Sequence, residues 1–166
     1  MERARPFIIA ALVLSTMFLL TQYASALEEG TRAPQFRAES FDGDAVSIRA
    51  HRGKVVIVDF WASWCEPCGD AMPVLDRIYR RYKEHGLVVI GVSVDERARN
   101  ARGFLRRNRV TFPVVHDADH SVAERYSPPT MPSTYVIDRR GVIRHVHAGF
   151  RNGDARRLEA EIRDLP

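Results

Sequence analysis

Two long apolar runs mark the middle of the chain. Residues 55–61 (VVIVDFW) and 87–95 (LVVIGVSVD) hold few polar side chains, which is typical of strands buried on both faces of a sheet. Between these runs, apolar residues recur at spacings of three and four from Glu66 to about Glu84. That spacing is typical of one buried face of a helix, and Gly86 is a suitable residue to end it.

Shorter patterns on either side of this centre complete the prediction. Residues 40–54 favour an extended pair around an Asp42–Gly43 turn, and residues 134–148 favour a second hairpin. The remaining expected elements are helices over 97–108, 120–126 and 152–165, the last capped by Asn152 or Asp154, and a short strand within 111–117. The order predicts an α/β domain with a central mixed sheet, helices on both faces and an extra N-terminal β-hairpin.

The first 26 residues follow a different pattern. Arg3 and Arg5 precede an apolar run over residues 6–20, and small residues follow at Ala24–Ala26. This order is typical of a secretory signal peptide, and the run is short for a membrane-spanning helix. We therefore expect a signal peptide over 1–26 and a single domain over 27–166, in the periplasm or otherwise outside the cytoplasm. An uncleaved membrane anchor is the alternative.

The charge of the chain gives no sign of a nucleic-acid partner. Lysine and arginine total 25 against 21 acidic residues, a formal net charge of +4. The basic residues are spread along the chain and mixed with acids, whereas a nucleic-acid site needs a focused basic face. We therefore expect no nucleic acid to bind, and a monomer is the default oligomeric state.

The only two cysteines, Cys65 and Cys68, are separated by two residues. A structural disulfide this short would close almost no loop and so would add little stability. A structural zinc site needs four ligands, but no second cysteine pair is present and no histidine follows at the required spacing. A redox couple remains, with no metal, and no cofactor motif accompanies it.

The expected position of the pair suits that chemistry. Cys65 lies between a buried strand and the helix that opens at Glu66, where unpaired N–H groups and the helix dipole stabilise a thiolate. Pro67 suits the first helical turn. Cys68 is one turn further on, so it can attack a mixed disulfide formed by Cys65 and release the bound partner.

Two acids near the cysteines have candidate roles. Asp59 lies in the first buried strand, where desolvation would raise its pKa into the range useful to a proton acceptor. The alternative is a strand-end aspartate with a local hydrogen bond. Glu66, between the cysteines, should disfavour the Cys65 thiolate and so make the protein a better reductant.

The segment "VDFWASWCEPC" resembles the active-site motif of the thioredoxin superfamily, and the exported TlpA/ResA-like thiol–disulfide oxidoreductases match best. The resemblance covers residues 29–165 and implies a thioredoxin-like fold. It implies that Cys65 attacks, that Cys68 resolves and that Trp64 flanks the site. It also implies that Asp59 helps to deprotonate Cys68.

The "MPST" segment extends the same resemblance. Pro132 matches the family's cis-proline, whose neighbouring backbone pairs with a bound peptide, and Met131 would face the substrate. The sequence departs from the pattern at Ala71, where some ResA-like proteins carry a glutamate, and at Pro128 and Pro129, where small or β-branched residues are usual. These departures concern substrate choice.

The resemblance implies an exported reductase of protein disulfides, for example those of the haem-binding cysteines of apocytochrome c. Such an enzyme would need a thiol-reductase electron donor in the membrane. A peroxidase is disfavoured, because "WASWC" lacks the threonine that such relatives carry shortly before a single attacking cysteine. Two alternatives stay open: a disulfide oxidase or isomerase, and a module that binds copper or apoproteins. In the last, Cys65, Cys68 and Met131 would be the copper ligands.

Overall fold

The protein is represented by a computed structural model that describes residues 27–165, so the expected signal peptide lies outside the described residues. The central sheet consists of β3 (Val55–Trp61), β4 (Leu87–Ser93), β5 (Val114–His116), β6 (Ser133–Ile137) and β7 (Ile143–Ala148). Its strand order is β5-β4-β3-β6-β7. β3, β4 and β5 are parallel, whereas β6 and β7 each run antiparallel to the neighbour before them, which confirms the predicted mixed sheet.

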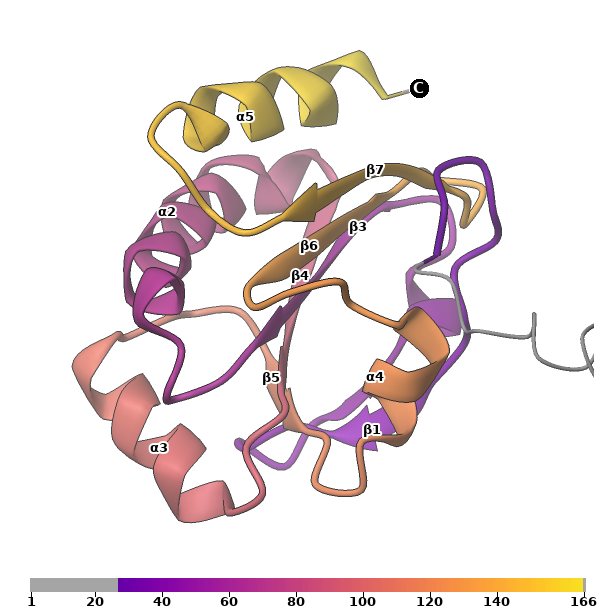
Figure 1. The fold of residues 1–166 in the computed structure, drawn as a ribbon. Coiled ribbons are helices and arrows are strands. Elements are labelled where there is room, and N and C mark those ends of the chain that lie inside the picture. Colours follow the sequence, from indigo (N-terminus) through magenta and orange to yellow (C-terminus); the bar gives the residue numbers. More distant parts are fainter. Residues whose placement is uncertain (1–26, 166) are drawn as a thin grey trace, which may run out of the picture.

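Helices cover both faces of this sheet (Figure 1). They are α2 (Glu66–Tyr82), α3 (Ala98–Arg107), α4 (Ser121–Tyr126) and α5 (Asp154–Asp164), with short 3-10 turns η1 (Ile48–His51) and η2 (Lys83–His85). Phe60 and Trp61 are consecutive in β3, so their side chains point to opposite faces. Trp61 packs on Phe104 of α3 and Phe60 packs on Tyr126 of α4, with ring centroids 4.7 Å and 5.2 Å apart. None of the helices within residues 27–165 is long and apolar enough to cross a membrane.

The predicted N-terminal hairpin is confirmed. β1 (Arg37–Glu39) and β2 (Ala45–Ser47) form a separate antiparallel pair. Gly43 lies in the turn between them with φ of 90°, a conformation that glycine adopts at little cost. The chain before β1 packs beside α4, because the Tyr126 hydroxyl donates a 2.9 Å hydrogen bond to the Pro34 carbonyl.

The predicted cap of the last helix is wrong. The N-cap of α5 is Gly153, with φ of 102°, and not Asn152 or Asp154. The chain enters this helix through a left-handed backbone position, which favours glycine over any residue with a side chain. The Asp154 carboxylate instead accepts a 2.6 Å hydrogen bond from the Arg151 N–H, which closes the turn before the helix.

β3 determines where the cysteines lie. All seven of its residues are buried, and it pairs with β4 on one side and β6 on the other. After Trp61 the chain leaves the sheet, passes through residues 62–64 and enters α2 at Glu66. The junction between strand and helix therefore lies at the C-terminal end of a strand that is fully buried and paired on both sides.

Candidate active site

Cys65 and Cys68 are joined by a disulfide at the start of α2. The S–S distance is 2.06 Å and the two Cα atoms are 5.4 Å apart. Cys65 is the N-cap of the helix, Pro67 lies in its first turn and Cys68 follows. The predicted position at a helix N-terminus is confirmed, so the helix dipole acts on the Cys65 sulfur whenever the disulfide opens.

The two cysteines differ in their access to solvent. Cys65 is 6% exposed, whereas Cys68 is fully buried. An incoming protein therefore reaches Cys65 first. Trp64, immediately before it, is 70% exposed, a high value for so large an apolar side chain, and Glu66 on the other side is also exposed.

Asp95 fixes the loop that leads into Cys65, and sequence reasoning missed this residue. It lies just after β4 and is 1% exposed. Its carboxylate accepts a 3.0 Å hydrogen bond from the Ser63 N–H, another from the Ser63 hydroxyl and a 2.9 Å hydrogen bond from the Ser93 hydroxyl. An acid directly after the apolar strand "VVIGVSV" was the available signal, because a carboxylate that ends a buried strand needs partners.

The pairing of β3 with β6 brings Pro132 to the same end of the sheet. Phe60 is opposite Ser133 in this antiparallel pair, so the residue before β6 lies where β3 ends. The Met131–Pro132 peptide bond is cis, as the resemblance implied. Pro132 is buried and Met131 is half-buried. Within residues 27–165, neither the N–H nor the C=O of Met131 has a backbone hydrogen-bond partner.

Asp59 is completely buried in the same strand pair. One carboxylate oxygen accepts a 2.7 Å hydrogen bond from the Thr134 hydroxyl, and the other, Oδ2, has no partner within the described residues. Burial raises the pKa of Asp59 to about 7, although the hydrogen bond from Thr134 acts in the opposite direction. The expectation of a raised pKa is confirmed. Sequence reasoning missed Thr134, which is 75 positions away along the chain.

The fold thus gathers the candidate residues at one end of the sheet. Cys65, Cys68, Trp64 and Glu66 come together through local sequence, whereas β3–β6 pairing places Pro132 and Met131 beside the end of β3 and Asp59 two residues before it. A disulfide at a helix N-terminus, at the same end of the sheet as a carboxyl group whose pKa is raised to about 7 by burial, is suited to thiol–disulfide exchange. Within residues 27–165, no three His, Cys, Asp or Glu side chains are arranged to hold a metal ion.

Comparisons with known proteins agree with this chemistry. Residues 30–146 match the AhpC/TSA family. The thiol-disulfide oxidoreductase ResA of Geobacillus thermodenitrificans is 32% identical over 125 residues, which cover 75% of this chain and 72% of that protein. ResA of Oceanobacillus iheyensis is 32% identical over 162 residues, which cover 95% of this chain and 83% of that protein.

A solved structure shows the same similarity in three dimensions. A putative thiol:disulfide interchange protein DsbE from Chlorobium tepidum is 34% identical and superposes with a TM-score of 0.79. The match covers 82% of this chain and 96% of that chain. Similarity therefore extends over nearly all of the described domain.

Proposed function

This chain belongs to the AhpC/TSA family and is a thiol–disulfide oxidoreductase of the ResA and DsbE type, and from that premise we propose that it acts outside the cytoplasm as a reductase of protein disulfides. The observation that carries the proposal is the Cys65–Cys68 pair at the N-terminus of α2, in which Cys65 is slightly exposed and Cys68 is fully buried. In this arrangement Cys65 attacks the partner protein and Cys68 releases it.

The proposed reaction has two exchange steps. In the reduced enzyme, the Cys65 thiolate attacks one sulfur of a substrate disulfide, and the other substrate sulfur leaves as a thiolate that takes a proton from solvent. Cys68 then loses its proton to Asp59 and attacks the Cys65 sulfur, which breaks the mixed disulfide and releases the second substrate sulfur as a thiolate. Two electrons pass to the substrate, and the enzyme ends as the Cys65–Cys68 disulfide.

The reductive direction rests on Glu66. Its exposed carboxylate follows Cys65 directly and adds negative charge where the thiolate forms. A less stable thiolate favours the disulfide form of the enzyme and so favours donation of electrons. The solvated position of Glu66 limits the size of this effect.

The substrate is proposed to be an extended segment of another protein. The exposed Trp64 offers apolar contact area beside Cys65, and the backbone of Met131, which has no backbone partner within residues 27–165, can hydrogen-bond to an incoming strand. The haem-binding cysteines of apocytochrome c are the proposed target, because the exported ResA-like branch that the chain resembles often serves cytochrome c maturation.

The electron supply is proposed to come from a thiol reductase in the membrane. The signal-like pattern of residues 1–26 would place the domain in an oxidising compartment, where a reductant must be reduced again after each turnover. The domain is proposed to be released into the periplasm as a monomer. The alternative is that an uncleaved N-terminal segment holds it at the membrane.

The experiment uses a peptide that holds two cysteines of an apocytochrome c haem site as a disulfide. The reduced Cys68→Ser variant should accumulate an adduct with this peptide, detected by intact mass, because the resolving thiol is missing. The matched Cys65→Ser variant should form none. The reverse pattern would invert the two roles. If neither variant forms an adduct and the reduced wild type binds Cu(I) tightly, the copper-binding module would be favoured.

A second measurement decides the direction of electron flow. The reduction potential of the Cys65–Cys68 couple is determined against a thiol–disulfide buffer. A potential near the roughly −270 mV of thioredoxin would support a reductase. A potential near the roughly −120 mV of DsbA would instead indicate a disulfide oxidase.

A further inference from the structure

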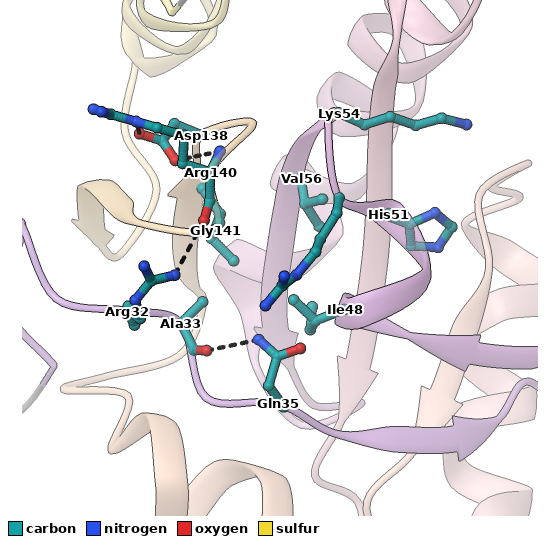
Figure 2. A pocket seen from close by; sticks show the side chains of 12 residues that line it. Arg32, Ala33, Gln35, Ile48, His51, Lys54, Val56, Asp138, Arg140 and Gly141 are labelled. Atoms are coloured by element: carbon teal, nitrogen blue, oxygen red, sulfur yellow. Dashed lines mark hydrogen bonds and ion pairs between the residues drawn. The ribbon is translucent and has the colours of Figure 1, made fainter.

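A basic hollow lies at the other end of β3 from the cysteines. Its cavity volume is about 170 Å³, and three segments line it: residues 32–35, residues 48–56 and residues 137–141 (Figure 2). β3 rises about 3.3 Å per residue, so its seven residues separate the hollow from the CxxC motif by about 20 Å. A ligand bound there would leave the cysteines accessible.

The hollow has an apolar floor and a cationic rim. Ile48, Val56 and Ile137 form the floor, and each is at most 4% exposed. Arg32 and Arg140 lie along one side in Figure 2, with Ile48 and Val56 opposite them. The three arginines of the rim, which are exposed, are Arg32, Arg52 and Arg140.

The rim cations are poorly neutralised by the protein. Among residues 27–165, no carboxylate lies within 4 Å of the Arg32 or Arg52 guanidinium. Asp138 is the one acid among the described residues that line the hollow, and it already accepts a 2.7 Å hydrogen bond from Arg144 and is 3.8 Å from Arg140. Exposed arginines around an apolar floor therefore leave an uncompensated positive charge.

The chemistry of the rim selects among anions. Guanidinium groups bind phosphate oxygens in a bidentate manner, and several of them suit an anion with more than one negative charge. A phosphate monoester carries about 1.5 to 2 charges at neutral pH, whereas a carboxylate carries one. The volume is below the roughly 300–1,000 Å³ of pockets that enclose a whole drug-sized ligand, so only a small head fits. The apolar floor accommodates the carbon atoms next to the phosphate.

We propose that this hollow binds a small phosphate-bearing anion with a short apolar portion. Two sources share that chemistry: the phosphate monoester headgroup of a lipid and a soluble phosphate monoester. Binding of either would fix the end of the domain that is opposite the cysteines, and it is independent of the proposed reaction.

The test uses the full chain in a neutral detergent. Amide chemical shifts of Gly53 and Gly141, which lie in the two turns beside the hollow, are followed during titration. The probes are inorganic phosphate, glycerol 3-phosphate and dihexanoyl phosphatidic acid, with dihexanoyl phosphatidylcholine as the zwitterionic control. We expect saturable shifts with at least one of the three anionic probes and none with the control.

A charge-matched pair of variants assigns the binding to the hollow. The triple variant Arg32→Gln, Arg52→Gln, Arg140→Gln should weaken binding at least tenfold. The control triple variant Arg77→Gln, Arg99→Gln, Arg106→Gln removes the same charge from exposed positions on α2 and α3 and should bind as the wild type does. If the first triple variant does not fold, Arg52→Gln alone replaces it, because the Arg52 side chain makes no hydrogen bond within residues 27–165.

The outcomes separate the two sources. Shifts with the phosphatidic acid alone identify a lipid headgroup, and shifts with glycerol 3-phosphate or inorganic phosphate identify a soluble anion as sufficient. The absence of saturable shifts with all three anionic probes overturns the proposal. Equal affinity in the wild type and in the rim variant also overturns it, because binding would then lie elsewhere.

Discussion

Asp59 makes the stability of the domain depend on pH. Its pKa is about 7 in the folded protein against an ordinary value of 3.8, because burial disfavours the charged form. Between these two values the folded state holds a proton that the unfolded state has lost, so the free energy of unfolding falls as pH rises from 4 to 7. Below pH 4 the full contribution is present, and above pH 7 it is lost.

The first prediction therefore concerns Asp59→Asn. The variant should gain stability relative to the wild type as pH rises from 4 to 8, by up to about 4 kcal/mol, since each pKa unit corresponds to about 1.4 kcal/mol. Urea unfolding of both proteins at pH 4 and pH 8 measures the difference. A gain that is equal at the two pH values would show that Asp59 does not titrate in this range.

The second prediction concerns the rate at which Cys68 resolves a mixed disulfide. If ionised Asp59 accepts the Cys68 proton, this rate should rise as pH increases through about 7 in the wild type. Asp59→Asn should lower the rate by about 100-fold or more at pH 8 and remove the rise. Rapid-quench mass analysis of a preformed Cys65 mixed disulfide measures it. A rise that persists unchanged in the variant would assign the proton transfer to another group.

The hydrogen-bond partners of Asp59 and Asp95 could not be predicted from the sequence. Asp59 was identifiable because a carboxylate interrupts an apolar run. Thr134 was not, because its contact with Asp59 depends on the register of two strands that are far apart in sequence. Asp95 reaches Ser63 across 32 positions in the same way. Spacing along the chain indicates which residues need a partner but not which residue supplies one.

Among the elements, α2 influences the Cys65 thiolate through its N-terminus and through the charge of its first residue, Glu66. The third prediction is that Glu66→Gln stabilises the Cys65 thiolate and makes the protein less reducing. An exposed charge at a helix terminus is worth about 0.3–1 kcal/mol, which raises the reduction potential by about 6–20 mV. Equilibration with glutathione measures the shift. Asp70→Asn, one turn further along the helix and also exposed, is the control and should change the potential less.

The loop between β3 and α2 gives the fourth prediction. Asp95→Ala should leave the Ser63 N–H and the Ser93 hydroxyl without their acceptor, at a cost of about 2–4 kcal/mol in the free energy of unfolding. Hydrogen exchange at the Ser63 amide should accelerate more than at amides in the middle of β4, because the damage is local. Uniform acceleration across β3 and β4 would instead show a general loss of stability.

For the whole molecule, the alternation of apolar runs and helical spacing was sufficient to predict the order of elements, the mixed sheet and the extra hairpin. Each of these predictions depends only on sequence patterns that extend over about 20 neighbouring residues. The hollow at the base of β3 does not, because its arginines come from three segments that only the folded chain brings together. The Gly153 cap was missed because the polar residues on both sides of it are equally suitable cap residues.

The fifth prediction concerns how the N-terminal segment joins the domain. The Gly30 N–H donates to the Ile143 carbonyl at 2.7 Å, the Ile143 N–H to the Thr31 carbonyl at 2.9 Å, and the Ala33 N–H to the Gly141 carbonyl at 3.0 Å. Residues 30–33 therefore lie along β7 and the turn before it as part of the folded domain. Cleavage after Ala26 would leave all of these contacts in place.

Deletion of residues 1–26 should accordingly leave the free energy of unfolding unchanged. Deletion of residues 1–33 should lower it by about 3 kcal/mol, because three backbone hydrogen bonds are lost at about 1 kcal/mol each. Urea unfolding of the two truncated chains measures both effects, and N-terminal sequencing of the exported protein should begin at Leu27. If deletion of residues 1–26 were as destabilising as the longer deletion, this segment would pack against the domain, and its interpretation as a detachable export signal would be wrong.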